Sequence, residues 1–138
     1  MADPRVTLIH DWFEQVWNQG DAGAIDRLMA DDAVIHGLRD ASGNELQGKE
    51  GFRPFFEKFR AAFPDLHVEV EDAIVEGEKI ACRCLVRGTH RGDSLGFAAT
   101  LRPVEFTGMC CIRVRDGQIV EGWNNFDFAT MSTQLQPA

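Results

Sequence analysis

Apolar residues stand three or four positions apart along the first part of the chain, which predicts helices. One helix is expected from Asp3-Pro4, an N-cap followed by a proline, to a stop at Gly20. A second, short helix starts at the cap residue Asp21, and a third begins near Glu50. One face of the third helix carries five phenylalanines: Phe52, Phe55, Phe56, Phe59 and Phe63.

From Leu66 onward the apolar positions alternate, and this period predicts strands. They are expected at 66–76, 79–91, 103–115 and 118–127, followed by a short helix over 128–135. A short strand is also expected in "DDAVIHG", before a loop rich in turn formers. This order predicts an α+β fold. Its sheet is cone-shaped, curved, mixed but mainly antiparallel, packed against three helices and enclosing a pocket.

Composition narrows the classes of partner. The chain has 138 residues, a size typical of a single domain spanning 1–138, and a net charge of −8. The negative charge argues against nucleic acid or an anionic membrane as a partner. No apolar run reaches the length of a membrane span, and the N-terminus lacks the features of a signal peptide. A cytoplasmic protein is therefore expected.

The four cysteines do not predict a metal site. The sequences "CRC" at Cys82 and Cys84 and "CC" at Cys110 and Cys111 differ from the C-x2-C spacing of zinc sites. On strands, Cys82 and Cys84 share a face, whereas Cys110 and Cys111 point to opposite faces. These residues are expected to be small apolar filler in a reducing compartment, with no bound metal.

Three segments that together span nearly the whole chain resemble one family. They read "WNQGDAGAIDRLMADDAVIHG", "GFRPFFEKFRAAFPDLHVEVEDAIVEGEKIACRCLVRGTH" and "FTGMCCIRVRDGQIVEGWNNFDFATMSTQL". In these segments the chain resembles the SnoaL-like polyketide (ester) cyclases, within the nuclear transport factor 2-like superfamily of α+β cones. That superfamily also carries isomerases, dehydratases, epoxide hydrolases and many non-enzymes, so the resemblance implies the fold more strongly than the reaction.

The resemblance implies a reaction and a residue that carries it. Polyketide cyclases of this family close a ring by an intramolecular aldol reaction without a cofactor. An aspartate at the end of the last long strand acts as general acid and base, and Asp127 matches it in the pattern from Trp123 to Asp127. Gly122 departs from the pattern, because many relatives have histidine before the tryptophan. The resemblance also implies a homodimer formed through the outer face of the sheet.

Asp127 has two interpretations. If strand alternation continues from Trp123 through Asn125, Asp127 shares their face among apolar neighbours, and desolvation raises its pKa toward the working pH. Asp127 also directly precedes the last predicted helix, where it would serve as N-cap. A backbone N–H bonded to the carboxylate would lower the pKa, so the two roles are only partly compatible.

Several other residues are candidates for contact with a substrate. His90, at the end of a strand, is the predicted catalytic helper, because a neutral imidazole can donate a hydrogen bond to a developing enolate oxygen. His36 and His67 match histidines common in the family and are predicted to contact substrate; an ordinary surface position is the alternative for each histidine. The remaining predicted substrate-binding residues are Trp123, Asn125, Phe13, Trp17, Phe59 and Phe106.

The sequence thus predicts a cofactor-independent cyclase, isomerase or lyase that acts on a small, largely apolar carbonyl compound. A ketosteroid isomerase is disfavoured, because the chain has no tyrosine to serve as oxyanion donor. The alternative is a non-catalytic protein of the same fold that binds a small molecule or serves as a scaffold. The ligand expected in the cone is a small apolar or aromatic molecule.

Overall fold

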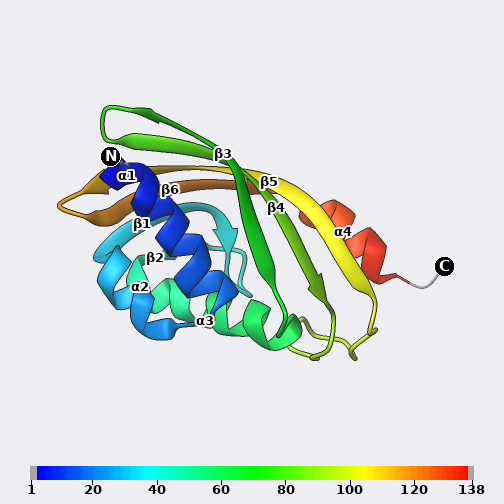
Figure 1. The fold of residues 1–138 in the computed structure, drawn as a ribbon. Coiled ribbons are helices and arrows are strands. Elements are labelled where there is room, and N and C mark those ends of the chain that lie inside the picture. The colour runs from blue at the N-terminus through cyan, green and yellow to red at the C-terminus, as the bar shows by residue number, and fades with distance from the viewer. Residues whose placement is uncertain (1–2, 137–138) are drawn as a thin grey trace.

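The computed structural model describes residues 3–136 and has the predicted α+β architecture (Figure 1). Its elements are α1 (Pro4–Asp11), the π-helical segment η1 (Trp12–Asn18), α2 (Ala22–Leu28), β1 (Met29–Arg39), β2 (Glu45–Gln47), α3 (Gly48–Ala62), β3 (His67–Glu76), β4 (Lys79–Thr89), β5 (Pro103–Arg115), β6 (Gln118–Phe126) and α4 (Phe128–Leu135). No helix within the described residues is both long and apolar enough to cross a membrane.

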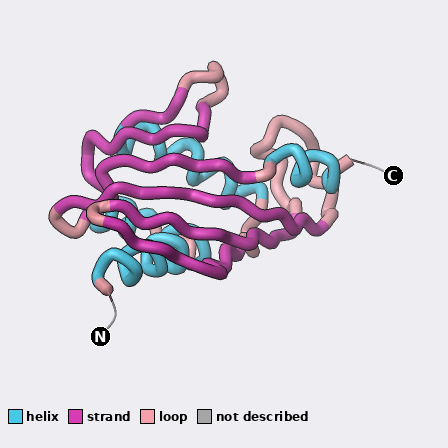
Figure 2. The backbone as a smooth tube through the Cα atoms, turned by 90° about the horizontal axis from the view of Figure 1, so that it is seen from above, coloured by secondary structure: helices cyan, strands magenta, loops and turns pink. Residues whose placement is uncertain are grey.

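Within residues 3–136, six strands form one curved sheet in the order β2-β1-β6-β5-β4-β3. Neighbouring strands are antiparallel except β1 and β6, which run parallel. Figure 2 shows the strands lying side by side with the N-terminal helices behind them. The helices α1, α2 and α3 cover the concave face, while α4 lies at the far end of the sheet (Figure 1). The predicted mixed, mainly antiparallel cone is confirmed.

The four long predicted strands differ from the observed ones by at most two residues at either end. Their alternation is visible in burial: along β4, Ile80, Cys82, Cys84 and Val86 are buried and the residues between them are not. Two elements differ from expectation. The predicted loop after "DDAVIHG" contains strand β2, and the predicted short strand is the eleven-residue β1. β2 is too short for alternation to reveal it.

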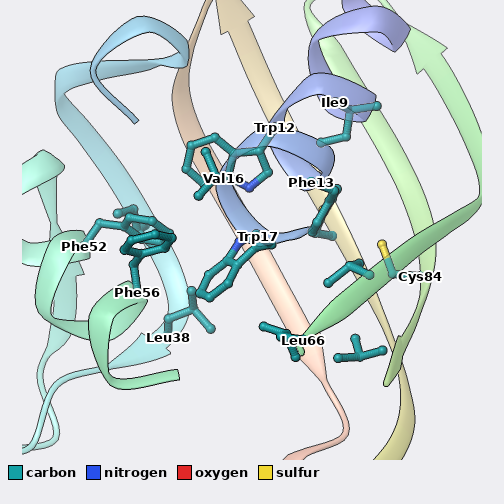
Figure 3. Packing of buried hydrophobic residues seen from close by; sticks show 14 of the residues in the cluster. Ile9, Trp12, Phe13, Val16, Trp17, Leu38, Phe52, Phe56, Leu66 and Cys84 are labelled. Atoms are coloured by element: carbon teal, nitrogen blue, oxygen red, sulfur yellow. The ribbon is translucent and has the colours of Figure 1, made fainter. Parts of the chain in front are cut away.

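The first helix changes its winding at Trp12. The backbone N–H of Gln19 donates to the carbonyl of Glu14, five residues earlier, at 2.9 Å, so η1 is wound as a π-helix. In an α-helix, residues five apart lie about 140° apart around the axis. The wider π turn instead brings Trp12 and Trp17 to one side, and both contact Phe52 of α3, with ring centroids 5.3 and 5.8 Å away. Figure 3 shows these rings facing α3.

Candidate functional site

A pocket lies between the helices and the concave face of the sheet. Its helical wall is aromatic and consists of Trp12, Phe13, Trp17, Phe52, Phe55 and Phe59. The empty space between the lining side chains, out to the mouth, is about 790 Å³, while the centre of a water-sized sphere can occupy about 90 Å³ of it. The pocket is therefore narrow, and a ligand larger than a few atoms must move side chains to enter.

The half-buried aromatic residues mark the open end of the pocket. Phe59 of α3 and Phe128 of α4 are both half-buried lining residues, and their ring centroids lie 5.7 Å apart. Phe126, also in the lining, lies flat over Gly108 of β5: a Cβ at Gly108 would come within 2.1 Å of its ring. Rotation of these phenylalanine rings is the simplest way to widen the mouth.

The sheet wall of the pocket carries almost no polar groups. On β6 the residues that line it are Ile119, Gly122, Asn124 and Phe126. Asn124 donates from its side-chain amide to the backbone carbonyl of His36 at 3.0 Å. Among residues 3–136, no aspartate, glutamate, lysine, arginine or histidine lines the pocket. A charged substrate would lose its hydration without finding a counter-charge, so the site suits an uncharged, largely apolar ligand.

Four of the predicted substrate-binding residues lie in this lining. Phe13 and Trp17 come from η1, Phe59 from α3 and Phe106 from β5. Their contact with a substrate stays a prediction, but their placement around one cavity is what that prediction requires.

Trp123 and Asn125 lie on the opposite, outer face of the sheet, which corrects the expected parity of β6. The pocket-facing residues of β6 before Phe126 are the buried Gly122 and the half-buried Asn124, so Trp123 and Asn125 point outward. The Trp123 ring stacks on the His36 ring at 5.4 Å and has the Lys79 ammonium 5.2 Å from its centroid.

Asp127 caps helix α4 and is exposed, so it is not the desolvated carboxylate expected in a pocket. One carboxylate oxygen accepts the backbone N–H of Thr130 at 3.0 Å, and the other accepts the Thr130 hydroxyl at 2.6 Å. These two bonds, first that from the hydroxyl and then that from the backbone, lower the pKa of Asp127 below its ordinary value. Asp127 stands between the end of β6 at Phe126 and the start of α4 at Phe128, which is the cap position of the helix.

Capping predicts a specific pattern of stability. Asp127→Ala removes both acceptors and is expected to lower the Tm by about 2–5 °C, whereas Asp127→Asn keeps a good cap and should change it by about 1 °C or less. Because the folded pKa is depressed, the stabilisation by Asp127 is present above pH 3.8 and is lost as the pH falls through the lower folded pKa. Thermal unfolding of both variants at neutral pH tests this, and equal losses in both would contradict capping.

His36 lies on the outer face, between two carboxylates. Its Nε2 is 2.8 Å from Glu121 Oε2, and its Nδ1 is 3.4 Å from Glu45 Oε1. The hydrogen bond to Glu121 is the main cause that raises the pKa of His36, and Glu45 adds to it. The predicted contact of His36 with a ligand in the cone is therefore not supported by its position.

The raised pKa of His36 predicts a pH-dependent stability. The folded protein holds the imidazole proton more tightly than the unfolded chain, so the stabilisation is full below about pH 6.5. It is lost as the pH rises through the folded pKa. The Tm difference between the wild type and His36→Gln should therefore be larger at pH 6 than at pH 9. A difference that does not vary with pH would contradict this, and Glu121→Gln serves as a control that should lower the pKa of His36 in an NMR titration.

His90 and His67 are also outside the pocket lining. His67 begins β3 and is exposed. His90 is fully buried beyond the end of β4, between the rings of Phe63 and Phe97. Its Nδ1 accepts the backbone N–H of Thr100 at 3.0 Å, so in the neutral ring Nε2 carries the proton, and Nε2 has no partner among the described residues.

The sequence of the chain matches the profile of the SnoaL-like polyketide cyclases over residues 7–135, nearly its whole length. The chain belongs to this family. Wild-type IdmH from Streptomyces antibioticus, a proposed polyketide cyclase, is 38% identical with a TM-score of 0.82, over 95% of this chain and 97% of that one. No curated protein matches the chain.

Other SnoaL-like structures share the fold but carry different names. A proposed polyketide cyclase from Bacillus cereus is 26% identical with a TM-score of 0.80, over 96% of this chain and 80% of that one. AclR from Streptomyces galilaeus, a proposed hydroxylase, is also 26% identical with a TM-score of 0.81, over 97% and 83% of the two chains. The same cone therefore goes with different proposed reactions, so the reaction must be argued from the pocket.

Most residues that line the pocket of this SnoaL-like chain were not among the predicted site residues, and three of them are instructive. Trp12 was not predicted because only a π turn brings it beside Trp17. Asn124 was not predicted because the opposite face of β6 was expected to point into the cone. Gly122 was noted as a departure from the family pattern, but the sequence did not show that it lines the pocket. Because it has no side chain, it leaves space in the cavity there. Within residues 3–136, no three histidine, cysteine or acidic side chains are grouped so that they could hold a metal ion.

Proposed function

We propose that this protein is a cofactor-independent cyclase that closes a ring in a small, largely apolar, polyketide-like carbonyl compound. The observation that carries the proposal is the pocket itself, which is narrow, aromatic and uncharged. Such a cavity binds a flexible apolar chain by burying its carbon surface and leaves it fewer conformations. Membership of the polyketide cyclase family and the 38% identity to IdmH, a proposed polyketide cyclase, support the same substrate class.

The proposed reaction is an intramolecular aldol closure. A carbon next to one carbonyl loses a proton to water at the mouth of the pocket, and the resulting enolate carbon forms a bond to the carbon of a second carbonyl. The oxygen of that second carbonyl takes up a proton, so no atom is gained or lost overall. The pocket contributes by holding the two carbons together and by excluding conformations that cannot react.

The general-base role of Asp127 stays a hypothesis beside this proposal. An exposed carboxylate whose pKa is lowered by its cap bonds is a weak base at neutral pH. Phe126 and Phe128 flank it in sequence and both line the pocket, so only a substrate atom held at the mouth lies near this part of the chain. We expect Asp127→Asn to keep turnover within about twofold, whereas a loss of about a hundredfold or more would establish catalysis by the carboxylate.

Product analysis tests the function directly. The substrate is an aromatic polyketide methyl ester with a ketone side chain that can close by an aldol reaction. Incubation without metal, nucleotide or nicotinamide should yield the ring-closed isomer faster than buffer does, as followed by chromatography and NMR. Recovery of a tightly bound but unchanged ester would instead favour the second candidate, a non-catalytic binding protein. That candidate is favoured by one observation: no acid or base lines the pocket within residues 3–136.

We further propose that the outer sheet face joins two copies of the chain. Its central strands present Met109, which is 56% exposed, next to the half-buried Cys111 and Trp123, and Ile74 on β3 is 67% exposed. Exposed apolar residues on a sheet face are typical of an interface.

The dimer proposal predicts that one charge in this face separates the two copies. Met109→Glu would bury an unpaired carboxylate at the interface and should convert a dimer to a monomer at micromolar concentration. Light scattering measures the mass of both proteins, and Glu105→Gln at the end of the same strand is the matched control. A wild type that is already monomeric overturns the proposal.

A further inference from the structure

The aromatic wall of the pocket carries two hydrogen-bond donors that the protein itself does not use. Trp12 and Trp17 both line the cavity, and within residues 3–136 neither indole N–H has a hydrogen-bond acceptor. The fully enclosed side-chain nitrogens or oxygens without a partner in that range are His90 Nε2 and Arg113 Nε. The two indole nitrogens are therefore not fully enclosed, and their rings line the cavity. A buried indole N–H usually has an acceptor.

The winding of η1 is what places these two donors together. Residues 12 and 17 share one side only because the segment is a π-helix. Such turns are rare in proteins overall, but where they occur they are often found at functional sites. In Figure 3 the blue indole nitrogen of each ring is on the edge turned toward the other tryptophan in that view. Phe52 packs against both rings and fixes their orientation.

We infer that the indole N–H groups of Trp12 and Trp17 bind a carbonyl oxygen of the ligand. This inference rests on the proposed function and names the polar feature of its substrate: an acceptor oxygen on an otherwise apolar molecule. In the narrow apolar cavity, two fixed donors bind an oxygen more strongly than they would in water. During the proposed aldol closure they stabilise the enolate oxygen as negative charge develops on it.

The other predicted oxygen-binding groups are not available for this role. His36 and Asn125 are on the outer face, and His90 lies behind Phe63 and Phe97. The Asn124 amide does line the pocket, but it donates to the backbone carbonyl of His36. The two indoles are thus the pocket donors without a protein acceptor among the described residues.

The test compares two probes of similar shape, 2-acetylnaphthalene, which has a carbonyl, and 2-ethylnaphthalene, which has none. The affinity of both is measured for the wild type, Trp12→Phe, Trp17→Phe and the double variant. Phenylalanine keeps an aromatic ring but removes the N–H. The ratio of the hydrocarbon Kd to the ketone Kd should fall about two- to tenfold for each indole removed. Trp123→Phe, on the outer face, is the matched control and should leave the ratio unchanged.

A second measurement uses the wild type and does not depend on the folding of any variant. The indole N–H signals in a ¹⁵N–¹H NMR spectrum are assigned from through-bond and NOE spectra of the wild type. The Trp12 and Trp17 signals should move downfield with the ketone much more than with the hydrocarbon, and the Trp123 signal should not move.

The outcomes separate this inference from the proposed function. An unchanged Kd ratio in the double variant, or equal NMR shifts with both probes, overturns the two-donor site while leaving the pocket as a ligand site. If neither probe binds the wild type, the proposed ligand site fails and the inference fails with it.

Discussion

Replacing Gly122 with phenylalanine is expected to weaken ligand binding strongly without unfolding the protein. Gly122 lies on the pocket side of β6, and a Cβ added there would have its nearest neighbours, Asn124 Nδ2 and Ile112 Cγ2, at 3.8 Å. That is ordinary van der Waals distance, so the backbone accepts a side chain. The added ring must then occupy the cavity, which is already narrow, and we expect affinity for an aromatic ketone to fall at least about tenfold.

The size series at this position makes the test sharper. Gly122→Ala should cost little affinity and Gly122→Leu more, in step with side-chain volume, while the Tm stays within a few degrees. Thr107→Phe is the matched control, because Thr107 is exposed on β5 and does not line the pocket. Unchanged affinity in Gly122→Phe would mean that the ligand does not occupy this part of the cavity. Titration calorimetry with 2-acetylnaphthalene provides the measurement.

The fold was largely predictable because its long elements have strong periodic patterns. Strands of ten or more residues with clear alternation, such as β4 and β5, leave little freedom in where they begin and end. The caps at Asp3 and Asp21 were also predictable, since both side chains accept a backbone N–H as expected. The three-residue β2 was not, because it depends on pairing with β1 rather than on its own sequence.

The site was less predictable, because alternation alone does not say which face of a strand is the inner one. On β6 both faces carry aromatic residues, Trp123 outside and Phe126 inside, so the sequence offers two parities of similar appearance. The register of β5 with β6 also shifts between Arg113 and Val114, which interrupts simple counting along the strand. The sequence therefore left two interpretations of Asp127 open, a carboxylate inside the cone and a helix cap, and in the structure it caps α4.

The largest effect on stability is expected from Gly37→Ala, in the parallel pair that closes the cone. Gly37 has φ +86°, and a Cβ there would lie 2.0 Å from the backbone carbonyl oxygen of Asn124 in β6. The positive φ alone costs an alanine about 1–2 kcal/mol. The clash adds about 1–3 kcal/mol, because the backbone of β6 must move. Chemical denaturation should therefore show a loss of about 2–5 kcal/mol.

Gly43→Ala separates the two causes of that loss. Gly43 has nearly the same φ, +85°, but a Cβ there would meet no heavy atom within 4 Å. Its alanine variant should therefore show only the conformational cost of about 1–2 kcal/mol. The difference between the two losses of unfolding free energy measures the cost of displacing the backbone of β6 from β1. Gly122 and Asn124 in the wall of the pocket lie on this strand. Equal losses of unfolding free energy would mean that β6 can shift at little cost. The wall of the pocket could then move to accommodate a ligand.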